Sequence, residues 1–455
     1  MAALLDPTSA EYKKARKQHE RSLRNRDAAH DWTPFRAAEK HYKARFPPPD
    51  LSRALDLATL DPARAPEIAA GGWRGSPSID GVKVQRLDGD GAESQPLARA
   101  YTLPHIPGLV ILPAFVGAAQ QRALIRWAVA EHARPPTETN LDIHHLIPPE
   151  GVWRAWLRAR AHPDAAPLMA VPKAACGPPA SPSPGPRQPT DNAPASPAAF
   201  AALARAPRPP PAPSPAARPA PAAALLRRLR WASLGWSYHW GTKQYDFARG
   251  PGAVDARVRA VCAAAVRAVP WGAVFDGGEG AWAEEGGGGG GGWRAWGETY
   301  EPDAGIVNFY QTKDTLMGHV DRSEVCATSP LVSISLGNAA VFLIGGTTRD
   351  SAPTALVLRS GDVLIMAGPA CRRAYHGVPR ILDGTLPPHL RGGGAEEWAP
   401  FAEYMQTTRV NVNVRQVFPK GFDPSVPQGS DPSVPKALDP SVPKALDPSA
   451  AASAS

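Results

Sequence analysis

The sequence predicts an α+β protein whose core is an antiparallel β-sandwich or barrel. From Gly305 onward, short β-rich segments follow one another with tight turns and no helical segment between them, which is typical of antiparallel sheets. The stretches "LVSISLGNAAVFLIGG" and "TALVLRSGDVLIMAG" each predict a β-hairpin, with turns at Gly337-Asn338 and Ser360-Gly361-Asp362. By contrast, residues 1–60 are polar and helical in pattern.

Shorter predicted elements precede this block of strands. The stretch "HIPGLVILPAF" (105–115) contains one apolar strand, and the following "QQRALIRWAVAEHA" predicts a helix. One stripe of that helix is apolar and comprises Leu124, Ile125, Ala128 and Val129. Ordered structure resumes at "RRLRWASLGWSYHW" (227–240), and "GIVNFYQ" then opens the strand series.

Composition divides the chain into regions of different character. Residues 1–60 predict a basic helical arm, and residues 100–160 and 224–420 supply the two ordered parts of one domain. Between these parts, residues 161–223 are rich in Ala and Pro. This insert is poor in large apolar side chains, so we expect it to be disordered or polyproline-like. The glycine-rich stretch 276–292 predicts a flexible loop, and residues 421–455 repeat "DPSVP", which predicts a low-complexity tail.

The chain is basic, with a formal charge of +8 and a pI near 9.4. Basic residues crowd the first helical segment: Lys13, Lys14, Arg16, Lys17, Arg21, Arg24 and Arg26. Such a cluster is either a solvated helix face or an arm that contacts phosphates, and the sequence leaves both interpretations open.

Cysteine usage indicates the redox environment. Cys176, Cys262, Cys326 and Cys371 show no paired spacing, which argues against a disulfide framework and against a cysteine zinc site. The sequence therefore favours a reducing intracellular compartment, the nucleus or the cytoplasm, and leaves a mitochondrial location open. No apolar run approaches the length of a membrane span and no secretory signal is visible, so we expect no membrane partner. The oligomeric state is not predicted.

The stretch "TRVNVNVRQVF" (408–418) predicts an unusual strand. Its period-2 alternation puts three valines on one face and polar residues on the other: Arg409, Asn411, Asn413 and Arg415. This polar face is either the solvated side of the sheet or the lining of a cavity that holds an anion.

A metal site is predicted by "GHVDRSE" (318–324) together with "RRAYHGVPR". His319 and Asp321 are two residues apart, so both side chains leave the same face of an extended strand. Two imidazoles and one carboxylate, completed here by His376, form the facial triad of non-haem Fe(II) oxygenases. Taken alone, the first motif also fits a structural His–Asp hydrogen bond and His376 also fits an ordinary loop residue. Their order before an Arg-bearing final strand is far more specific.

Iron enzymes of this kind need a co-reductant, and 2-oxoglutarate offers a distal carboxylate that requires a cationic partner. Arginine meets a carboxylate through two parallel hydrogen bonds. Arg409 and Arg415 lie about 20 Å apart along an extended strand at about 3.3 Å per residue, with Asn411 and Asn413 between them. We therefore expect the polar face of this strand to line the interior.

The motifs "NFY" (308–310), "HVDRSE", "YHGVPR" and "RVNVNVR" resemble the AlkB family of Fe(II)/2-oxoglutarate-dependent dioxygenases. The similarity covers residues 305–418, with weaker similarity in 105–160 and 227–247, and is greatest to the branch of the first human AlkB homologue. It implies a double-stranded β-helix (jelly-roll) core with an N-terminal helical and lid extension. Asn413 departs from the family pattern, which usually has Thr at this position.

The resemblance also implies a role for each matched residue. The Fe(II) ligands would be His319, Asp321 and His376. The residues that line the 2-oxoglutarate site would be Asn308, Tyr310, Arg409, Asn411, Asn413 and Arg415. Within this set Arg409 would pair with the distal carboxylate and Arg415 would lie nearest the substrate. The third reactant would be O₂.

Family members bind a methylated base through an aromatic lid that precedes the barrel. The residues at matching positions are Trp236, Ser237 and Tyr238, with Trp153 upstream. A flipped base needs an aromatic or apolar sandwich, which favours substrate stacking for Trp236 and Tyr238. For Trp153, ordinary core packing is an equal alternative.

The resemblance implies oxidative removal of N-methyl groups from bases, with release of formaldehyde, succinate and CO₂. The expected substrates are N6-methyladenine in DNA, N1-methyladenine in tRNA, or both. A protein demethylase or hydroxylase acting on histone tails would share the iron site and stays open. A non-catalytic nucleic-acid-binding module, or a cupin-like metal-binding protein, would not require all three ligands and both arginines, and this chain keeps them all.

Overall fold

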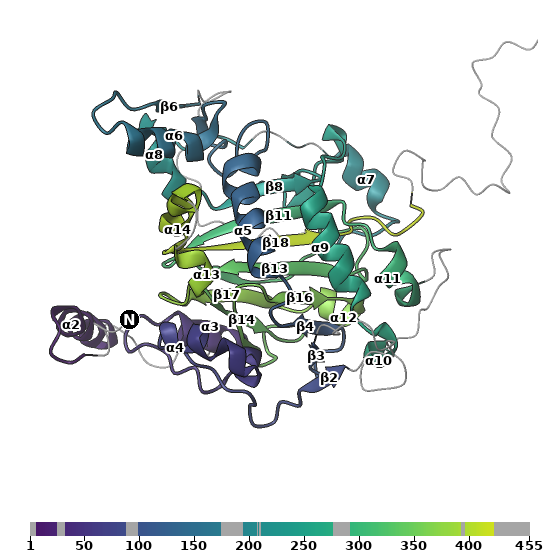
Figure 1. The fold of residues 1–455 in the computed structure, drawn as a ribbon. Helices are drawn as coiled ribbons and strands as arrows, with labels where there is room; N and C mark the ends of the chain where they lie inside the picture. The colour runs from purple at the N-terminus through teal and green to yellow at the C-terminus, as the bar shows by residue number, and fades with distance from the viewer. Residues whose placement is uncertain are drawn as a thin grey trace, which may run out of the picture. The chain divides into compact units, whose positions relative to one another are not determined.

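Two β-sheets dominate the fold (Figure 1). The computed structural model describes residues 6–24, 32–87, 99–173, 194–206, 208, 211–275, 292–392 and 396–422. The eight-stranded sheet has, in order, β2 (Gln85–Leu87), β3 (Ala100–Thr102), β4 (Leu109–Leu112), β16 (Val363–Met366), β13 (Leu331–Gly337), β18 (Thr408–Arg415), β11 (Ala304–Gln311) and β8 (Trp231–Gly235). The five-stranded sheet has β1 (Ala54–Leu55), β15 (Thr354–Leu358), β14 (Ala340–Ile344), β17 (His376–Ile381) and β12 (Leu316–His319).

Neighbouring strands in both sheets run antiparallel, except β1, which is parallel to β15. Apolar side chains from the two sheets meet in one buried cluster, which includes Ile111, Tyr310, Phe342, Leu356 and Leu364. The predicted α+β class and jelly-roll core are therefore confirmed.

Helices cover the outer face of the eight-stranded sheet. α5 (Ala118–Arg126), which continues as a π-helical turn (Trp127–His132), and α9 (Ala256–Arg267) lie across this sheet in Figure 1. Their apolar faces form a second core with the outward valines of β18. All four residues of the predicted stripe on α5 and the turn after it are buried. The remaining helices are α2 (Ala10–Arg24), α3 (Pro34–Lys43), α4 (Ala65–Ala70), α6 (Gly151–Ala161), α7 (Phe200–Arg205), α8 (Ala222–Leu225), α10 (Trp271–Phe275), α11 (Trp296–Thr299), α12 (Gly368–Arg372), α13 (Pro388–Arg391) and α14 (Ala399–Met405).

The prediction of two hairpins was wrong. The four strands exist, but β13 and β14, joined at Gly337-Asn338, belong to different sheets, as do β15 and β16, joined at Ser360-Gly361-Asp362. Each tight turn carries the chain from one sheet to the facing one, and the hairpin is instead formed by β14 and β15. A local turn signal does not specify whether the strands it joins pair together or pack face to face, and both faces of these strands are buried.

The Ala/Pro-rich insert 161–223 differs from its expected disorder in its described parts. β6 (Met169–Pro172) pairs with β5 (His145–Leu146) and β7 (Ala220–Pro221). In α7, Phe200 is buried against Phe418, and the Ala195 N–H donates to the Arg322 carbonyl at 2.8 Å. One large aromatic residue anchors this segment, which the average composition of the insert conceals. Residues 174–193 lie outside the described residues, as do 276–291 of the glycine-rich loop and 423–455 of the tail.

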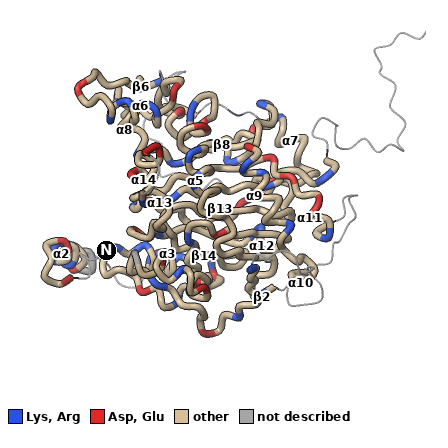
Figure 2. Tube along the Cα trace, viewed as in Figure 1, with Lys and Arg blue, Asp and Glu red and all other residues tan. Residues whose placement is uncertain are grey.

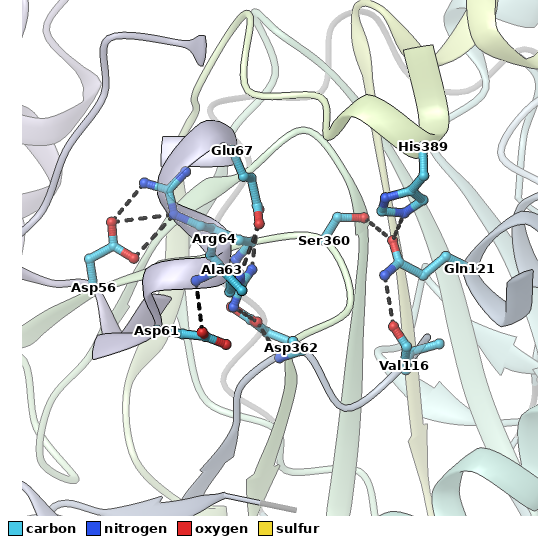
Figure 3. Close-up of polar contacts among 12 residues, drawn as sticks. Asp56, Asp61, Ala63, Arg64, Glu67, Val116, Gln121, Ser360, Asp362 and His389 are labelled. Atoms are coloured by element: carbon cyan, nitrogen blue, oxygen red, sulfur yellow. Dashed lines mark hydrogen bonds and ion pairs between the residues drawn. The ribbon is translucent and has the colours of Figure 1, made fainter. Parts of the chain in front are cut away.

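The prediction of a separate arm over residues 1–60 also needs correction, because the second half of this segment packs into the domain. β1 extends the five-stranded sheet, and Asp56 accepts hydrogen bonds from the fully buried Arg359 guanidinium, with Nη2–Oδ2 at 2.7 Å. Nearby, Arg64 Nη1 lies 2.8 Å from Asp362 Oδ1 (Figure 3). Asp362 also accepts from the Arg359 and Ala114 backbone N–H groups, so these ion pairs tie the N-terminal segment to the turn between β15 and β16.

Lys, Arg, Asp and Glu are spread over the elements visible in Figure 2, and α2 carries both signs of charge. Basic residues outnumber acidic ones in the sequence of α2, AEYKKARKQHERSLR. Among the described residues no helix has the length and apolar character needed to cross a membrane. Cys262, Cys326 and Cys371 are buried free thiols, and Cys176 lies outside the described residues.

Candidate active site

The three predicted metal ligands lie together at the edge of the five-stranded sheet. β12 ends at His319, β17 begins at His376, and the two residues are directly opposed in the antiparallel ladder. Their ring centroids are 4.4 Å apart, and His319 Nε2 lies 3.7 Å from Asp321 Oδ1. One ligand atom from each residue lies within 4.8 Å of the others, which is close enough to hold one metal ion.

Backbone carbonyls orient both imidazoles. Nδ1 of His319 lies 2.9 Å from the Met317 carbonyl oxygen, and Nδ1 of His376 lies 3.0 Å from the Ala374 carbonyl oxygen. With Nδ1–H donating to these carbonyls, each Nε2 keeps its lone pair for a metal. Two imidazole nitrogens and one carboxylate suit a non-haem Fe(II) centre.

The protonation states also suit metal binding. Burial raises the pKa of Asp321, but the nearby Arg415 guanidinium and the two imidazoles outweigh burial and hold that pKa below its usual range. Burial, reinforced by the neighbouring His319, lowers the pKa of His376 to about 4. At neutral pH the site therefore presents a carboxylate and a neutral imidazole, the forms that coordinate metals.

The polar face of β18 points between the sheets, as predicted. Arg409 is 2% exposed and donates to the Asn338 carbonyl (3.1 Å), the Leu358 carbonyl (3.3 Å) and Ser335 Oγ (2.8 Å). Its Nε has no acceptor, and none of the described carboxylates forms an ion pair with it. Burial lowers the pKa of Arg409 to about 10, so the group stays charged at neutral pH. A buried cation without an anionic partner fits the distal carboxylate of a bound dicarboxylate.

A row of hydrogen-bonded polar side chains, here called the polar floor, crosses β11, β18 and β13 through Asn308, Asn411 and Ser333. Asn308 of β11 lies opposite Asn411, and its Nδ2 donates to Asn411 Oδ1 at 3.5 Å. Asn411 Nδ2 in turn donates to Ser333 Oγ at 2.8 Å on β13. Tyr310 lies opposite Arg409 on β11, and Asn413 is half-buried further along β18.

Sequence reasoning missed Ser333 and Ser335, although both belong to the inward face of "LVSISLG" by simple alternation. Their role depends on β13 lying beside β18, which the sequence did not specify.

Arg415 is held beside the predicted metal ligands by three side chains. Its Nη2 lies 3.3 Å from Asp321 Oδ2, its Nε lies 3.2 Å from Glu324 Oε1, and its Nη1 donates to the Tyr245 hydroxyl at 3.3 Å. Tyr245 also donates to Glu324, at 3.2 Å. Glu324 and Tyr245 were not predicted, although Glu324 ends the "HVDRSE" motif that carries two of the predicted metal ligands.

The predicted lid residues have different positions. The Tyr238 hydroxyl lies 3.4 Å from Ser323 Oγ, two residues beyond Asp321, and burial raises the pKa of Tyr238 to about 12. Trp236 is buried against Phe418, and Ser237 donates to Glu138 at 3.3 Å. The structure does not bring Trp153 to the site. Its side chain is 3% exposed in the second core, outside the eight-stranded sheet, and it stacks on Phe401 with 4.5 Å between ring centroids.

Two tryptophans that were not predicted flank the site instead. Trp231 on β8 lies opposite Asn308, and its ring lies 5.0 Å from that of Trp240. Trp240 is 39% exposed and also contacts Tyr238 edge-on at 5.0 Å. Trp231, Trp240 and Tyr238 therefore form an aromatic row beside the polar floor.

Comparison with known proteins identifies the domain. A family model described as the 2OG-Fe(II) oxygenase superfamily matches residues 198–415. Residues 198–415 therefore belong to the 2OG-Fe(II) oxygenase superfamily. The match begins inside the Ala/Pro-rich insert, just before α7, and ends with Arg415.

Relatives of this 2OG-Fe(II) oxygenase domain include AlkB homologues, which confirms the resemblance. The DNA N(6)-methyladenine demethylase ALKBH1A of Arabidopsis thaliana is 37% identical over 203 residues, covering 43% of this chain and 51% of the relative. The nucleic acid dioxygenase ALKBH1 of Homo sapiens is 33% identical over 218 residues, covering 43% and 47%. The tRNA demethylase abh1 of Schizosaccharomyces pombe is 36% identical over 194 residues, covering 42% and 54%.

The chain spans about half the length of these curated relatives. A solved structure described as "The structure of OsALKBH1" matches with a TM-score of 0.35 and 18% identity, covering 68% of this chain and 97% of that one.

Proposed function

We propose that this protein is an Fe(II)/2-oxoglutarate-dependent dioxygenase that removes N-methyl groups from bases in nucleic acid. One arrangement carries the proposal. His319, Asp321 and His376 converge within 4.8 Å, while the nearby β18 presents Arg409, a buried cation without a carboxylate partner among the described residues. A metal centre beside a site for a dicarboxylate is what this chemistry requires.

Each part of the pocket has an assigned task. Fe(II) would be held by His319 Nε2, His376 Nε2 and the Asp321 carboxylate, and Arg409 would bind the distal carboxylate of 2-oxoglutarate. Fe(II), 2-oxoglutarate and O₂, when bound, would supply the oxidation of the methyl group, which leaves as formaldehyde with succinate and CO₂ as co-products. The protein contributes position and charge, since Arg415 fixes the Asp321 carboxylate.

The remaining polar residues would shape the pocket around the co-substrate. Asn308, Tyr310, Asn411 and Asn413 lie on β11 and β18 beside Arg409. Asn411 is held by Ser333, so its side chain cannot rotate freely and offers a fixed amide. Fixed donors and acceptors position a reactant better than mobile ones, because less side-chain entropy is lost on binding.

A methylated base is the substrate that the surroundings favour. The row of Trp231, Trp240 and Tyr238 offers flat apolar surface beside the site, and Trp240 is open to solvent. An extruded base is bound by stacking on aromatic rings. The relatives are named for N6-methyladenine in DNA and for tRNA, so N6-methyladenine in DNA and N1-methyladenine in tRNA are the two substrates we propose. None of the relatives named here is described by a histone substrate.

The test is an incubation of the full chain with Fe(II), 2-oxoglutarate and ascorbate. The substrates are methylated DNA oligonucleotides, tRNA fragments and methylated histone peptides, each followed by mass spectrometry for methyl loss while succinate is measured in parallel. We expect methyl loss from at least one nucleic acid, and none with the Asp321→Ala variant, which lacks a metal ligand.

The outcomes separate the parts of the proposal. Succinate formed with methyl loss from peptides alone would overturn the nucleic-acid substrate but keep the dioxygenase. No succinate with any substrate, from folded protein loaded with iron, would overturn the dioxygenase itself.

A further inference from the structure

Helix α3 from the N-terminal segment packs on the outside of the strand that carries His319. It contacts β12 and β17, the strands that carry His319 and His376, and also β14. Figure 1 shows α3 beside β14 and β17. The roles proposed above do not use α3.

The residue before His319 lacks regular strand partners. The register of β12 against β17 shifts between Leu316 and His319, so the ladder does not continue through Gly318. Side chains satisfy this residue instead: the Gly318 N–H donates to Glu39 Oε1 of α3, and the Gly318 carbonyl accepts from Arg349 Nη2 at 3.1 Å. Buried backbone groups need such partners, and an irregular strand has to find them outside the ladder.

Packing leaves no free space around this peptide. A Cβ atom at Gly318 would collide with the ring of Phe35 on α3, and a Cβ atom at Gly377 would lie 3.0 Å from the Gly318 nitrogen. The backbones of β12 and β17 therefore approach closely at Gly318 and Gly377, next to the opposed pair of histidines, and the Phe35 ring packs against Gly318. The imidazoles of the neighbouring residues, His319 and His376, have ring centroids 4.4 Å apart.

Glu39 is itself fixed in place. Its side chain is 5% exposed, and its second oxygen, Oε2, lies 2.9 Å from Arg36 Nη1 one turn earlier. The start of α3 is anchored too, because the Phe35 N–H donates to the Arg349 carbonyl at 3.1 Å. Glu39 and Arg349 thus hold opposite sides of Gly318 and are joined through the start of α3.

We propose that Glu39 is a positioning residue for the metal centre, which it serves by fixing the peptide that orients His319. The metal's identity rests on the proposed function, but the role of Glu39 does not depend on the substrate. Without its carboxylate, the Gly318 N–H loses its partner and the end of β12 is free to shift relative to β17. We expect the change to lower metal affinity while the protein stays folded, because Phe35 and Tyr42 still anchor α3 in its core. Partners that orient metal ligands in this way typically contribute about 10–100-fold to affinity.

The experiment is a titration of the full chain with Co(II), a spectroscopic substitute for Fe(II), followed by visible absorption. Glu39→Ala is expected to raise the Co(II) dissociation constant about 10–100-fold and to alter the absorption bands. Glu39→Gln keeps an amide oxygen that accepts from Gly318, so it should restore most of the affinity. Lys43→Ala, an exposed change on the same helix, is the matched control and should leave both readouts unchanged.

A further variant covers the case in which Glu39→Ala does not fold. Glu39→Met keeps the side-chain volume but removes the acceptor, and it should show the same loss of Co(II) affinity. Wild-type Co(II) affinity and spectrum in a folded Glu39→Ala or Glu39→Met protein would overturn the positioning role alone. If the unaltered protein binds no Co(II) at these histidines, the metal centre of the proposed function fails, and the positioning role fails with it.

Discussion

Arg409 donates to Ser335 Oγ at 2.8 Å across the boundary between β18 and β13. Its two other acceptors are backbone carbonyls, so every group that holds this buried guanidinium is neutral. The contacts fix the direction of the charge without neutralising it. A charge that is held in this way can bind an incoming carboxylate with little rearrangement.

The first prediction is that Arg409→Lys is not a conservative change. Lysine keeps the charge but loses the planar fork and the simultaneous contacts with Ser335 and the carbonyls. A charge-assisted hydrogen bond contributes about 1.5–3 kcal/mol, so we expect the apparent KM for 2-oxoglutarate to rise by about 10–100-fold. Steady-state succinate formation at varied 2-oxoglutarate measures this. A normal KM would remove Arg409 from the co-substrate site.

The matched control for that change is Val412→Thr on the same strand. Val412 is fully buried in the second core, between the eight-stranded sheet and its covering helices, on the face of β18 opposite Arg409. A hydroxyl placed there without a partner costs about 1–3 kcal/mol of folding free energy. Urea denaturation should therefore show lower stability, while the KM for 2-oxoglutarate stays unchanged. The reverse pattern for the two variants would invert the assignment of the faces.

This strand shows what the sequence could predict. The alternation of valines with arginines and asparagines is a local property, and so is the short spacing of His319 and Asp321. The alternation is found in the structure of β18, where burial of both faces fixes the strand register. The side chains of His319 and Asp321 also lie close together there. The partners of these residues were harder to predict: Ser333 and Ser335 reach the pocket only because β13 pairs with β18, and strand order is not a local property.

The regions judged by composition were predicted less well. Average composition concealed Phe200, whose single aromatic ring anchors α7 in the insert. It also concealed Asp56, because a buried ion pair with Arg359 links positions that are 303 residues apart. Contacts of this kind depend on the tertiary fold and leave no periodic trace in the sequence.

The second prediction tests that long-range pair. Asp56→Ala leaves Arg359 charged and buried with no carboxylate partner, and breaking a buried pair on one side typically costs about 3–5 kcal/mol. We expect a large fall in the urea midpoint, with residues 34–73 becoming susceptible to proteolysis. Arg99→Ala is the control, because its 3.8 Å contact with Asp61 is exposed and should contribute less than about 1 kcal/mol. Equal stability of both variants would show that the N-terminal segment is a dispensable arm.

The third prediction concerns pH. Burial raises the pKa of Asp303 to about 7, although the Val417 N–H donates to its Oδ1 at 2.7 Å. The folded state therefore binds this proton more tightly than the unfolded chain, in which the pKa is about 3.9. The contribution to stability is complete below about pH 4 and is lost as the pH rises to about 7.

Asp303→Asn keeps the acceptor for Val417 and removes the titration. We expect the variant to be more stable than the unaltered protein at pH 8, by on the order of 1–3 kcal/mol. The gain should disappear toward pH 4. Urea denaturation of both proteins across this range measures the difference, in which groups common to both cancel. A difference that does not change with pH would show that Asp303 ionises normally.

The last prediction concerns α2, whose basic side chains are solvent-exposed at Lys13, Lys14, Arg16, Lys17 and Arg21. If this helix contacts the phosphates of a nucleic acid, each contact releases counterions, and the logarithm of affinity falls with the logarithm of salt concentration. Replacing Lys13 and Lys14 with Gln should weaken binding of a methylated duplex without sequence preference. It should also make the salt dependence shallower, by about 0.9 per lost phosphate contact on B-DNA.

Arg259→Gln with Arg267→Gln removes the same charge from exposed positions on α9 and is the matched control. Fluorescence anisotropy at several salt concentrations gives the slope for each protein. A shallower slope in the α2 variant alone assigns phosphate contacts to that helix, because the net charge of the two variants is equal. If both variants show the same slope, the effect belongs to net charge, and α2 is an ordinary solvated helix.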